Sequence, residues 1–285
     1  MLHDDEKPAF HAPAGACDSH FHVFGPPGSY GYGADLRYEP PHAPLEDYLA
    51  LAGRLGIERF VFVQPSAYGR DNACMLDAMA RTQAPRRGIV DVDEHAPDAE
   101  LARMDALGVR GVRINVRPVM PPQPGFGDTL VPRIQRLAAR CAEIGWHLDF
   151  LLPGWLTVEL MPVLRGLQLP FTLAHLGMQQ AALGTDAPGF RQVLELVRGG
   201  DRHCRLKVTG IYRISTAPDF DDVGPMVRAA LEAAPDRVIW GSDYPHLSFG
   251  DNSSVALFNL LGKWVPDPVL RKRILVDTPA ELYGF

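Results

Sequence analysis

Short apolar runs alternate with longer amphipathic segments along the whole of this 285-residue chain. The apolar runs are rich in Val, Ile, Leu, Phe or Trp and predict eight strands, at residues 15–24, 59–64, 88–93, 109–116, 146–152, 171–175, 204–209 and 237–241. Helical patterns lie between and after them, at residues 45–55, 72–83, 98–107, 131–144, 157–167, 190–198, 219–233, 254–260 and 268–275, with a closing turn at 278–283. Eight strands that are each followed by a helix predict the α/β class and, within it, a (β/α)8 TIM barrel.

The predicted barrel occupies the chain as a single domain, residues 1–285, with residues 1–14 as an N-terminal tail. Near-continuous apolar strands are typical of a parallel sheet that is covered on its outside. The alternative is a doubly wound open sheet, which usually carries a glycine-rich phosphate-binding turn after its first strand. The first strand here ends in His-Phe-His-Val-Phe-Gly, which is not such a turn.

The first predicted strand carries two histidines, His20 and His22, in an otherwise apolar stretch. Side chains two positions apart on a strand point to the same face, so we expect the two imidazoles side by side. Such a pair could hold a divalent metal ion, or polarise a carbonyl group as neutral imidazoles. The alternative is one exposed histidine and one hydrogen-bonded core histidine, because His-x-His is a short and common pattern.

Reactive side chains in a (β/α)8 barrel lie at the C-terminal ends of the strands. The ends of the predicted strands, with the residues that follow them, are unusually polar: His20, His22, Gln64, Ser66, Arg113, Asn115, Arg117, His175, Lys207, Thr209, Arg213, Asp243 and His246. Two long proline-rich loops, residues 25–44 and 118–127, also follow strands, and we expect them to cover the same face. For Lys207 the sequence leaves two roles open, contact with a substrate or pairing with an acid.

Composition and charge exclude several classes of partner. The formal net charge of −6 and the absence of a Lys/Arg run argue against nucleic acid. The four cysteines form no C-x-x-C pair, and we expect buried reduced thiols at Cys17, Cys74, Cys141 and Cys204. The first residues lack a signal-peptide pattern and no long apolar run occurs, so we expect a cytoplasmic protein without a membrane span. The oligomeric state stays open.

Three features together resemble the amidohydrolase superfamily. These are the His-x-His of the first strand, the single His175 at the end of the sixth, and Asp243 after Trp-Gly-Ser on the eighth. Within amidohydrolase family 2, the sequence is similar to the 2-pyrone-4,6-dicarboxylate lactonase group, whose relatives also act on sulfomuconolactone and on sugar lactones. The matching segments extend over most of the chain: 18–26, 37–40, 63–66, 69–72, 108–115, 174–177 and 237–246.

The resemblance implies a hydrolase of aromatic catabolism that opens the lactone ring of a carboxylated small molecule. Asp243 would take the proton from the attacking water. His20, His22 and His175 would surround the lactone carbonyl and stabilise the oxyanion. Arginine matches a carboxylate with two parallel hydrogen bonds, and the resemblance implies substrate-binding residues at Arg113, Arg117, Arg213, Tyr38, Ser66 and His246.

The sequence departs from the pyrone lactonases at two cationic positions. Val119 and Met178 stand where that group has arginine, so a lactone with one carboxylate or a sugar-acid lactone stays open as the substrate. Those lactonases work without a metal, which favours an enzyme that requires no cofactor. The alternative is one Zn²⁺, with His20, His22, His175 and Asp243 as its ligands.

Two other classes of function compete with lactone hydrolysis. The same scaffold could carry a metal-dependent decarboxylase, a hydratase or a sugar-lactone isomerase. A non-catalytic binder of small molecules is the third reading. Replacement of Asp243 separates enzyme from binder, because only an enzyme would lose turnover while a binder keeps its affinity.

Overall fold

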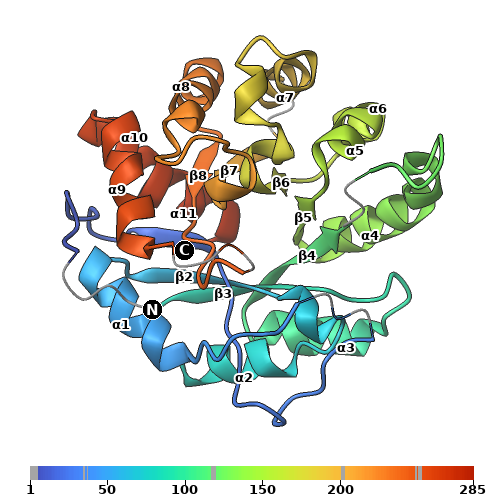
Figure 1. The fold of residues 1–285 in the computed structure, drawn as a ribbon. Helices are drawn as coiled ribbons and strands as arrows, with labels where there is room; N and C mark the ends of the chain where they lie inside the picture. Colours follow the sequence, from blue (N-terminus) through green and yellow to red (C-terminus); the bar gives the residue numbers. More distant parts are fainter. Residues whose placement is uncertain are drawn as a thin grey trace. The chain divides into compact units, whose positions relative to one another are not determined.

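The computed structural model describes residues 6–34, 36, 38–116, 120–199, 203–247, 249 and 252–285. Within them, strands and helices alternate, and the strands keep chain order from β1 to β8 through one sheet (Figure 1). This is the (β/α)8 barrel class, and the fold class predicted from the sequence is confirmed. The chain divides into two units, residues 1–110 with 240–285 and residues 111–239. The single-domain organisation stays a prediction.

All eight predicted strands are present and are mostly buried. Their bounds are β1 Cys17–Phe21, β2 Arg59–Val63, β3 Arg86–Val90, β4 Val109–Asn115, β5 His147–Leu151, β6 Phe171–Leu173, β7 Cys204–Val208 and β8 Val238–Trp240. The strands are shorter than the apolar runs that predicted them. The reason is that an apolar run stays buried beyond the last ladder hydrogen bond, as Val23 and Phe24 do after β1.

The first unit contains β1, β2 and β3, which pair in parallel in that order. Its helices are α1 Leu45–Leu55, α2 Ala73–Arg81, α3 Asp98–Ala106, α9 Ser254–Trp264, α10 Pro268–Lys272 and α11 Thr278–Tyr283, with a π-helical turn at Arg273–Asp277. In the predicted N-terminal tail, Phe10 stacks on Phe258 of α9 with ring centroids 4.3 Å apart. Aromatic stacking of this kind fixes the segment before β1 to the unit.

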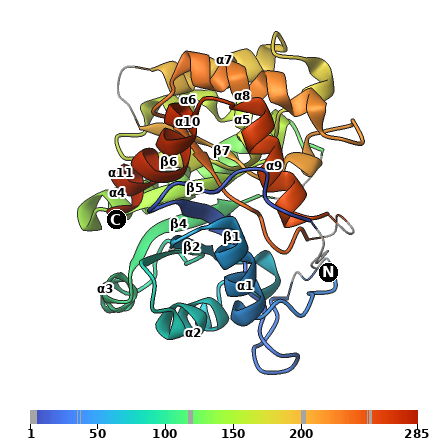
Figure 2. The ribbon, with the colours of Figure 1, turned by 90° about the vertical axis from the view of Figure 1, so that its left-hand side faces the viewer.

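The second unit contains β5, β6 and β7, again parallel and in chain order, with most of β4 beside β5. Its helices are α4 Val131–Ile144, α5 Gly154–Glu159, α6 Met161–Gly166, α7 Pro188–Arg198 and α8 Gly224–Ala233. Figure 2 shows α7 and α8 side by side. The predicted helix 157–167 is wrong as one element: it is two helices, α5 and α6, because Pro162 lacks the N–H that a continuous helix requires.

Two of the predicted helices, α1 and α4, have the predicted bounds. The predicted helix 268–275 is instead α10 followed by the π-helical turn, and the predicted closing turn 278–283 is the helix α11. The four cysteines are free and buried, as expected. Among the described residues, none of the helices has both the length and the apolar character needed to cross a membrane.

Candidate active site

Three of the predicted catalytic residues meet in the first unit. His20 lies in β1, His22 follows that strand, and Asp243 lies three residues after β8. All three are buried, with Nε2 of each histidine 3.5 Å from Oδ1 of Asp243. The two imidazole rings meet edge to face, with centroids 5.0 Å apart. The structure therefore places two imidazoles against one carboxylate in a site shielded from water.

The backbone around Asp243 is strained and closely packed. Asp243 has φ of 55°, a left-handed conformation that residues other than glycine rarely adopt. Its N–H donates to the carbonyl of His20 at 2.8 Å, and the N–H of His22 donates to the carbonyl of Tyr244 at 2.9 Å. A Cβ on Gly241 would lie 2.6 Å from Cβ of His20, so only glycine permits this approach. Such strain clusters at functional sites, where surrounding contacts hold it in place.

The hydrogen bonds of His22 define which of its nitrogens carries a proton. Nδ1 lies 2.8 Å from the carbonyl oxygen of Val63. Because a carbonyl only accepts, Nδ1 must be the protonated nitrogen, and in a neutral ring Nε2 is then an acceptor. That acceptor faces Oδ1 of Asp243. Nε2 of His22 and Oδ1 of Asp243 are therefore two acceptors that face each other. A proton on Nε2, a metal ion between the two atoms or a water molecule that donates to both would satisfy them.

The cluster fits a divalent metal by its donor set and spacing. Its two imidazole nitrogens and one carboxylate oxygen lie within 4.8 Å of one another. Catalytic zinc sites use three such protein ligands. With bonds near 2.1 Å, tetrahedral zinc ligands lie about 3.4 Å apart, close to the 3.5 Å between each histidine nitrogen and Asp243. His20, His22 and Asp243 could thus hold one ion.

Other predicted substrate-binding residues of the first unit are placed as follows. The hydroxyl groups of Tyr38 and Ser66 lie 3.3 Å apart, within hydrogen-bond reach. His246 is buried, with Nε2 2.7 Å from the hydroxyl of Ser254 at the start of α9. This bond orients the imidazole of His246, because it fixes one ring nitrogen on the helix.

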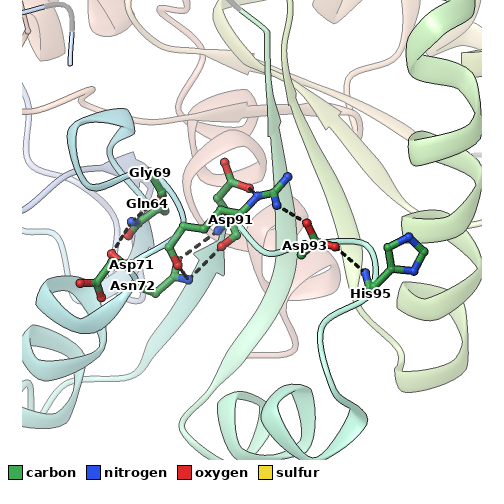
Figure 3. Close-up of polar contacts among 8 residues, drawn as sticks. Gln64, Gly69, Asp71, Asn72, Asp91, Asp93 and His95 are labelled. Atoms are coloured by element: carbon green, nitrogen blue, oxygen red, sulfur yellow. Dashed lines mark hydrogen bonds and ion pairs between the residues drawn. The ribbon is translucent and has the colours of Figure 1, made fainter. Parts of the chain in front are cut away.

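The loop between β2 and α2 is shaped by two amide side chains (Figure 3). Gln64 donates from Nε2 to the carbonyls of Gly69 and Asp71, at 3.0 and 2.8 Å. Asn72 donates to the carbonyl of Asp91 at 2.9 Å and accepts from its N–H at 3.1 Å. These bonds replace the backbone partners that a loop lacks. They fix the segment that carries Ser66.

The second unit buries an ion pair that the sequence alone did not predict. Nζ of Lys207 in β7 lies 2.7 Å from Oδ1 of Asp149 in β5, and neither side chain is exposed. The hydroxyl of Thr172 also donates to Asp149. Burial by itself would raise the pKa of Asp149, yet the charges of Lys207 and Arg113, with these hydrogen bonds, lower it to about 2. Of the two roles left open for Lys207, pairing with an acid is the one observed.

Predicted catalytic His175 follows β6 on a left-handed turn. His175, Leu176 and Gly177 all have φ between 51° and 67°. Each left-handed residue other than glycine costs about 1–2 kcal/mol. Gln179 braces the turn by donating from Nε2 to the carbonyls of Gly177 and Gly154, at 3.2 and 3.1 Å. The left-handed turn, held by Gln179, therefore sets the direction of the backbone at His175.

Of the predicted substrate-binding arginines, Arg213 lies among the described residues and Arg117 does not. Arg213 ends a 3₁₀ turn, Ile211–Arg213, with its guanidinium carbon 5.4 Å from the ring centre of Tyr212. Arg117 lies outside the described residues. Arg113 and His175, like Arg213, belong to the second unit.

Sequence reasoning assigned no role to Asp18, although Asp18 lies in β1 two residues before His20. It also missed Asp149, a single carboxylate in the apolar strand His-Leu-Asp-Phe-Leu. In both cases the signal was an acid inside a buried strand, where a charge needs a partner. The sequence could not name that partner.

A (β/α)8 barrel with two histidines in and directly after β1 and an aspartate after β8 is typical of one class of enzyme. Comparison with known proteins identifies that class. The amidohydrolase family model matches residues 17–285, and the chain belongs to that family. 4-Sulfomuconolactone hydrolase of Rhizobium radiobacter is 37% identical over 281 residues, 97% of this chain and 92% of that protein. 2-Pyrone-4,6-dicarboxylate hydrolase of Comamonas testosteroni is 32% identical over 292 residues, with coverage of 97% and 92%. The resemblance found in the sequence is confirmed.

A solved structure from Agrobacterium tumefaciens has the same fold. Its TM-score with this chain is 0.85 at 26% identity, and the match covers 98% of each chain. The match therefore includes residues of both units.

Replacement of Lys207 by methionine should destabilise the protein by about 3 kcal/mol, because it leaves a buried carboxylate without its nearest cation. The sign of the pH effect follows from the pKa of Asp149, which is lowered to about 2 in the folded state. Its stabilising contribution is present above about pH 4, the ordinary range of aspartate, and is lost as the pH falls toward 2. Lys207→Met should raise the pKa of Asp149 toward or above its ordinary value, so the acid loss of stability from this carboxylate should become smaller than in the wild type.

Urea unfolding across a pH series measures both effects. Lys272→Met is the matched control, because Lys272 pairs with Asp277 on the surface and should contribute less than about 1 kcal/mol. Equal, small losses for the two variants at pH 7 would contradict the assigned role of the buried pair.

Proposed function

We propose that this protein is a hydrolase that opens the lactone ring of a small carboxylated molecule, using a water activated by Asp243. The observation that carries the proposal is the buried Asp243 carboxylate, held on a strained turn 3.5 Å from two imidazoles. A buried carboxylate of this kind suits proton abstraction from a water that is held within hydrogen-bond reach of it. Relatives whose names state hydrolysis of a muconolactone and of a pyrone dicarboxylate support a lactone as the substrate.

The proposed reaction balances with one water and no other reactant. The water oxygen bonds to the lactone carbonyl carbon as Asp243 takes one of the water protons. The tetrahedral intermediate collapses with cleavage of the bond between this carbon and the ring oxygen. The ring oxygen receives the proton, and the product is an open-chain carboxylic acid. Asp243 returns to its ionised form.

The proposed task of the histidines is to stabilise the oxyanion that forms on the carbonyl oxygen. His22 already donates Nδ1–H to Val63, so it can donate from Nε2 only as an imidazolium. The carboxylate of Asp243, 3.5 Å away, favours that charged form. We assign the same task to His20 and to His175, on residue type and resemblance.

The proposed substrate contacts follow residue chemistry. Arg113 and Arg213 would each donate hydrogen bonds to a carboxylate of the substrate, with Arg117 as a further cation. Tyr38 and Ser66 are two hydroxyls within hydrogen-bond reach of each other, a pair suited to one polar substrate group. His246 would contact the substrate from a ring that Ser254 orients.

If a metal ion is bound, His20, His22 and Asp243 would hold it, and it would polarise the carbonyl and lower the pKa of a water. The same donor set is the one observation that favours the second candidate function, a metal-dependent decarboxylase, hydratase or lactone isomerase. The four free, buried cysteines are typical of a reducing compartment, and we infer a cytoplasmic location.

Asp243→Asn should lower kcat for lactone hydrolysis by about 10² to 10⁴-fold, the usual contribution of a general base. Asparagine tolerates the left-handed backbone at this position, so the fold should persist. The measurement is hydrolysis of a panel of pyrone dicarboxylate, muconolactones, and aldono- and aldarolactones. Asp93→Asn is the control, because Asp93 is a half-buried aspartate of the same unit that pairs with Arg70. Near-normal turnover by Asp243→Asn would sink the mechanism.

Arg113→Met should raise KM for carboxylated lactones by about tenfold or more, because a charged hydrogen bond is worth about 1.5–3 kcal/mol. Neutral lactones should be affected far less. Arg165→Met provides the control, since Arg165 pairs with Glu195 on the surface of the same unit. An equal loss for charged and neutral substrates would remove the assigned role of Arg113.

Hydrolysis should survive treatment with a chelator, because a lactone is more reactive than an amide and cationic side chains suffice to polarise it. Turnover and metal content are measured on the same samples before and after chelation. Loss of turnover that Zn²⁺ restores would instead make His20, His22 and Asp243 ligands. Metal-dependent activity without hydrolysis of any lactone would favour the second candidate function.

A further inference from the structure

We propose that Asp18 is a positioning residue that sets the distance between His20 and Asp243 by binding the backbone on both sides of that pair. The consequence for catalysis rests on the proposed function, whereas the consequence for geometry does not. Asp18 touches none of the reacting groups, so it acts through the two segments it joins.

The hydrogen bonds of Asp18 link β1 to the segment after β8. Oδ1 accepts the N–H of His20 at 3.0 Å and the N–H of Ser242 at 3.0 Å. One carboxylate oxygen therefore holds the backbone of His20 and the residue directly before Asp243. The pairing of β1 with β2 shifts register between Asp18 and Phe21. Such a bulge re-aims side chains next to active sites.

The second carboxylate oxygen of Asp18 is held by helix α1. Oδ2 accepts the hydroxyl proton of Tyr48 at 3.0 Å. The ring of Tyr48 stacks on Phe21 with centroids 3.5 Å apart, so the hydroxyl cannot easily turn away. Both oxygens of Asp18 thus have fixed donors, and the carboxylate cannot rotate without breaking one of them.

Burial makes this carboxylate expensive to keep. Asp18 is 1% exposed, and burial raises its pKa to about 6 despite the hydrogen bonds from Ser242, His20 and Tyr48. An apolar residue would avoid the cost of a buried acid. Asp18 instead provides a single side chain that holds both the backbone of His20 and that of Ser242. A misplacement of about 1 Å in a reacting group costs about 10²-fold in rate.

Three variants separate positioning from simple destabilisation. Asp18→Ala removes both acceptors, and kcat should fall about 10²-fold while KM changes less than about threefold. Asp18→Asn keeps one oxygen for the two N–H groups. The hydroxyl proton of Tyr48 can rotate while its oxygen stays in place and accepts from the new amide, so most of the turnover should return. Tyr48→Phe should have a smaller effect on kcat than Asp18→Ala. Leu55→Ala in α1 is the control that lowers stability without touching the pair.

Crystal structures of the same variants test the geometry independently of activity. In Asp18→Ala the distance from His20 Nε2 to Asp243 Oδ1 should grow by about 1 Å from 3.5 Å. An unchanged distance, or equal losses of kcat for the Ala and Asn variants, would overturn the positioning role. If Asp18→Ala does not fold, Asp18→Asn and Tyr48→Phe decide the question by their kcat and their distances. If the wild type hydrolyses no lactone, the proposed function fails, and the distance alone decides the role of Asp18.

Discussion

The close approach of the β1 backbone to the segment after β8 is the constraint on which the candidate site depends. Gly241 makes the approach possible, since any side chain there would collide with His20. Reciprocal backbone bonds then hold the two segments, from Asp243 to His20 and from His22 to Tyr244. With the backbones fixed in this way, the two imidazoles and the carboxylate meet without a flexible linker. Preorganisation of this kind removes the cost of ordering reacting groups during a reaction.

Each unit contains a buried aspartate, and the two aspartates have different kinds of partner. In the first unit, the carboxylate of Asp18 is held by backbone N–H groups and a tyrosine hydroxyl, and its pKa rises to about 6. In the second, Asp149 has a lysine within 2.7 Å, and its pKa falls to about 2. The difference follows from the partner: a full positive charge outweighs the cost of burial, whereas neutral donors do not. Two equally buried aspartates thus have pKa values shifted in opposite directions.

Three of the candidate site residues have a strained backbone. Asp243, His246 and His175 all have left-handed φ, and none is a glycine. Hydrophobic periodicity carries no trace of these conformations, because they depend on contacts from elsewhere in the chain. Hydrophobic periodicity also misses the break between α5 and α6 at Leu160, but there the cause is local, because Pro162 ends the continuous helix.

The sequence by itself determined the fold class and the family, and it named the candidates for the reactive side chains. Local patterns carry that information: apolar runs predict buried strands, and His20, His22, His175 and Asp243 are recognised from the residues beside them. Only the tertiary structure decided how His20, His22 and Asp243 meet, which nitrogen of His22 is protonated, and that Asp18 joins their backbones. Asp18 and Ser242 are more than two hundred residues apart, and a hydrogen bond between them exists only after folding has brought the ends of the chain together.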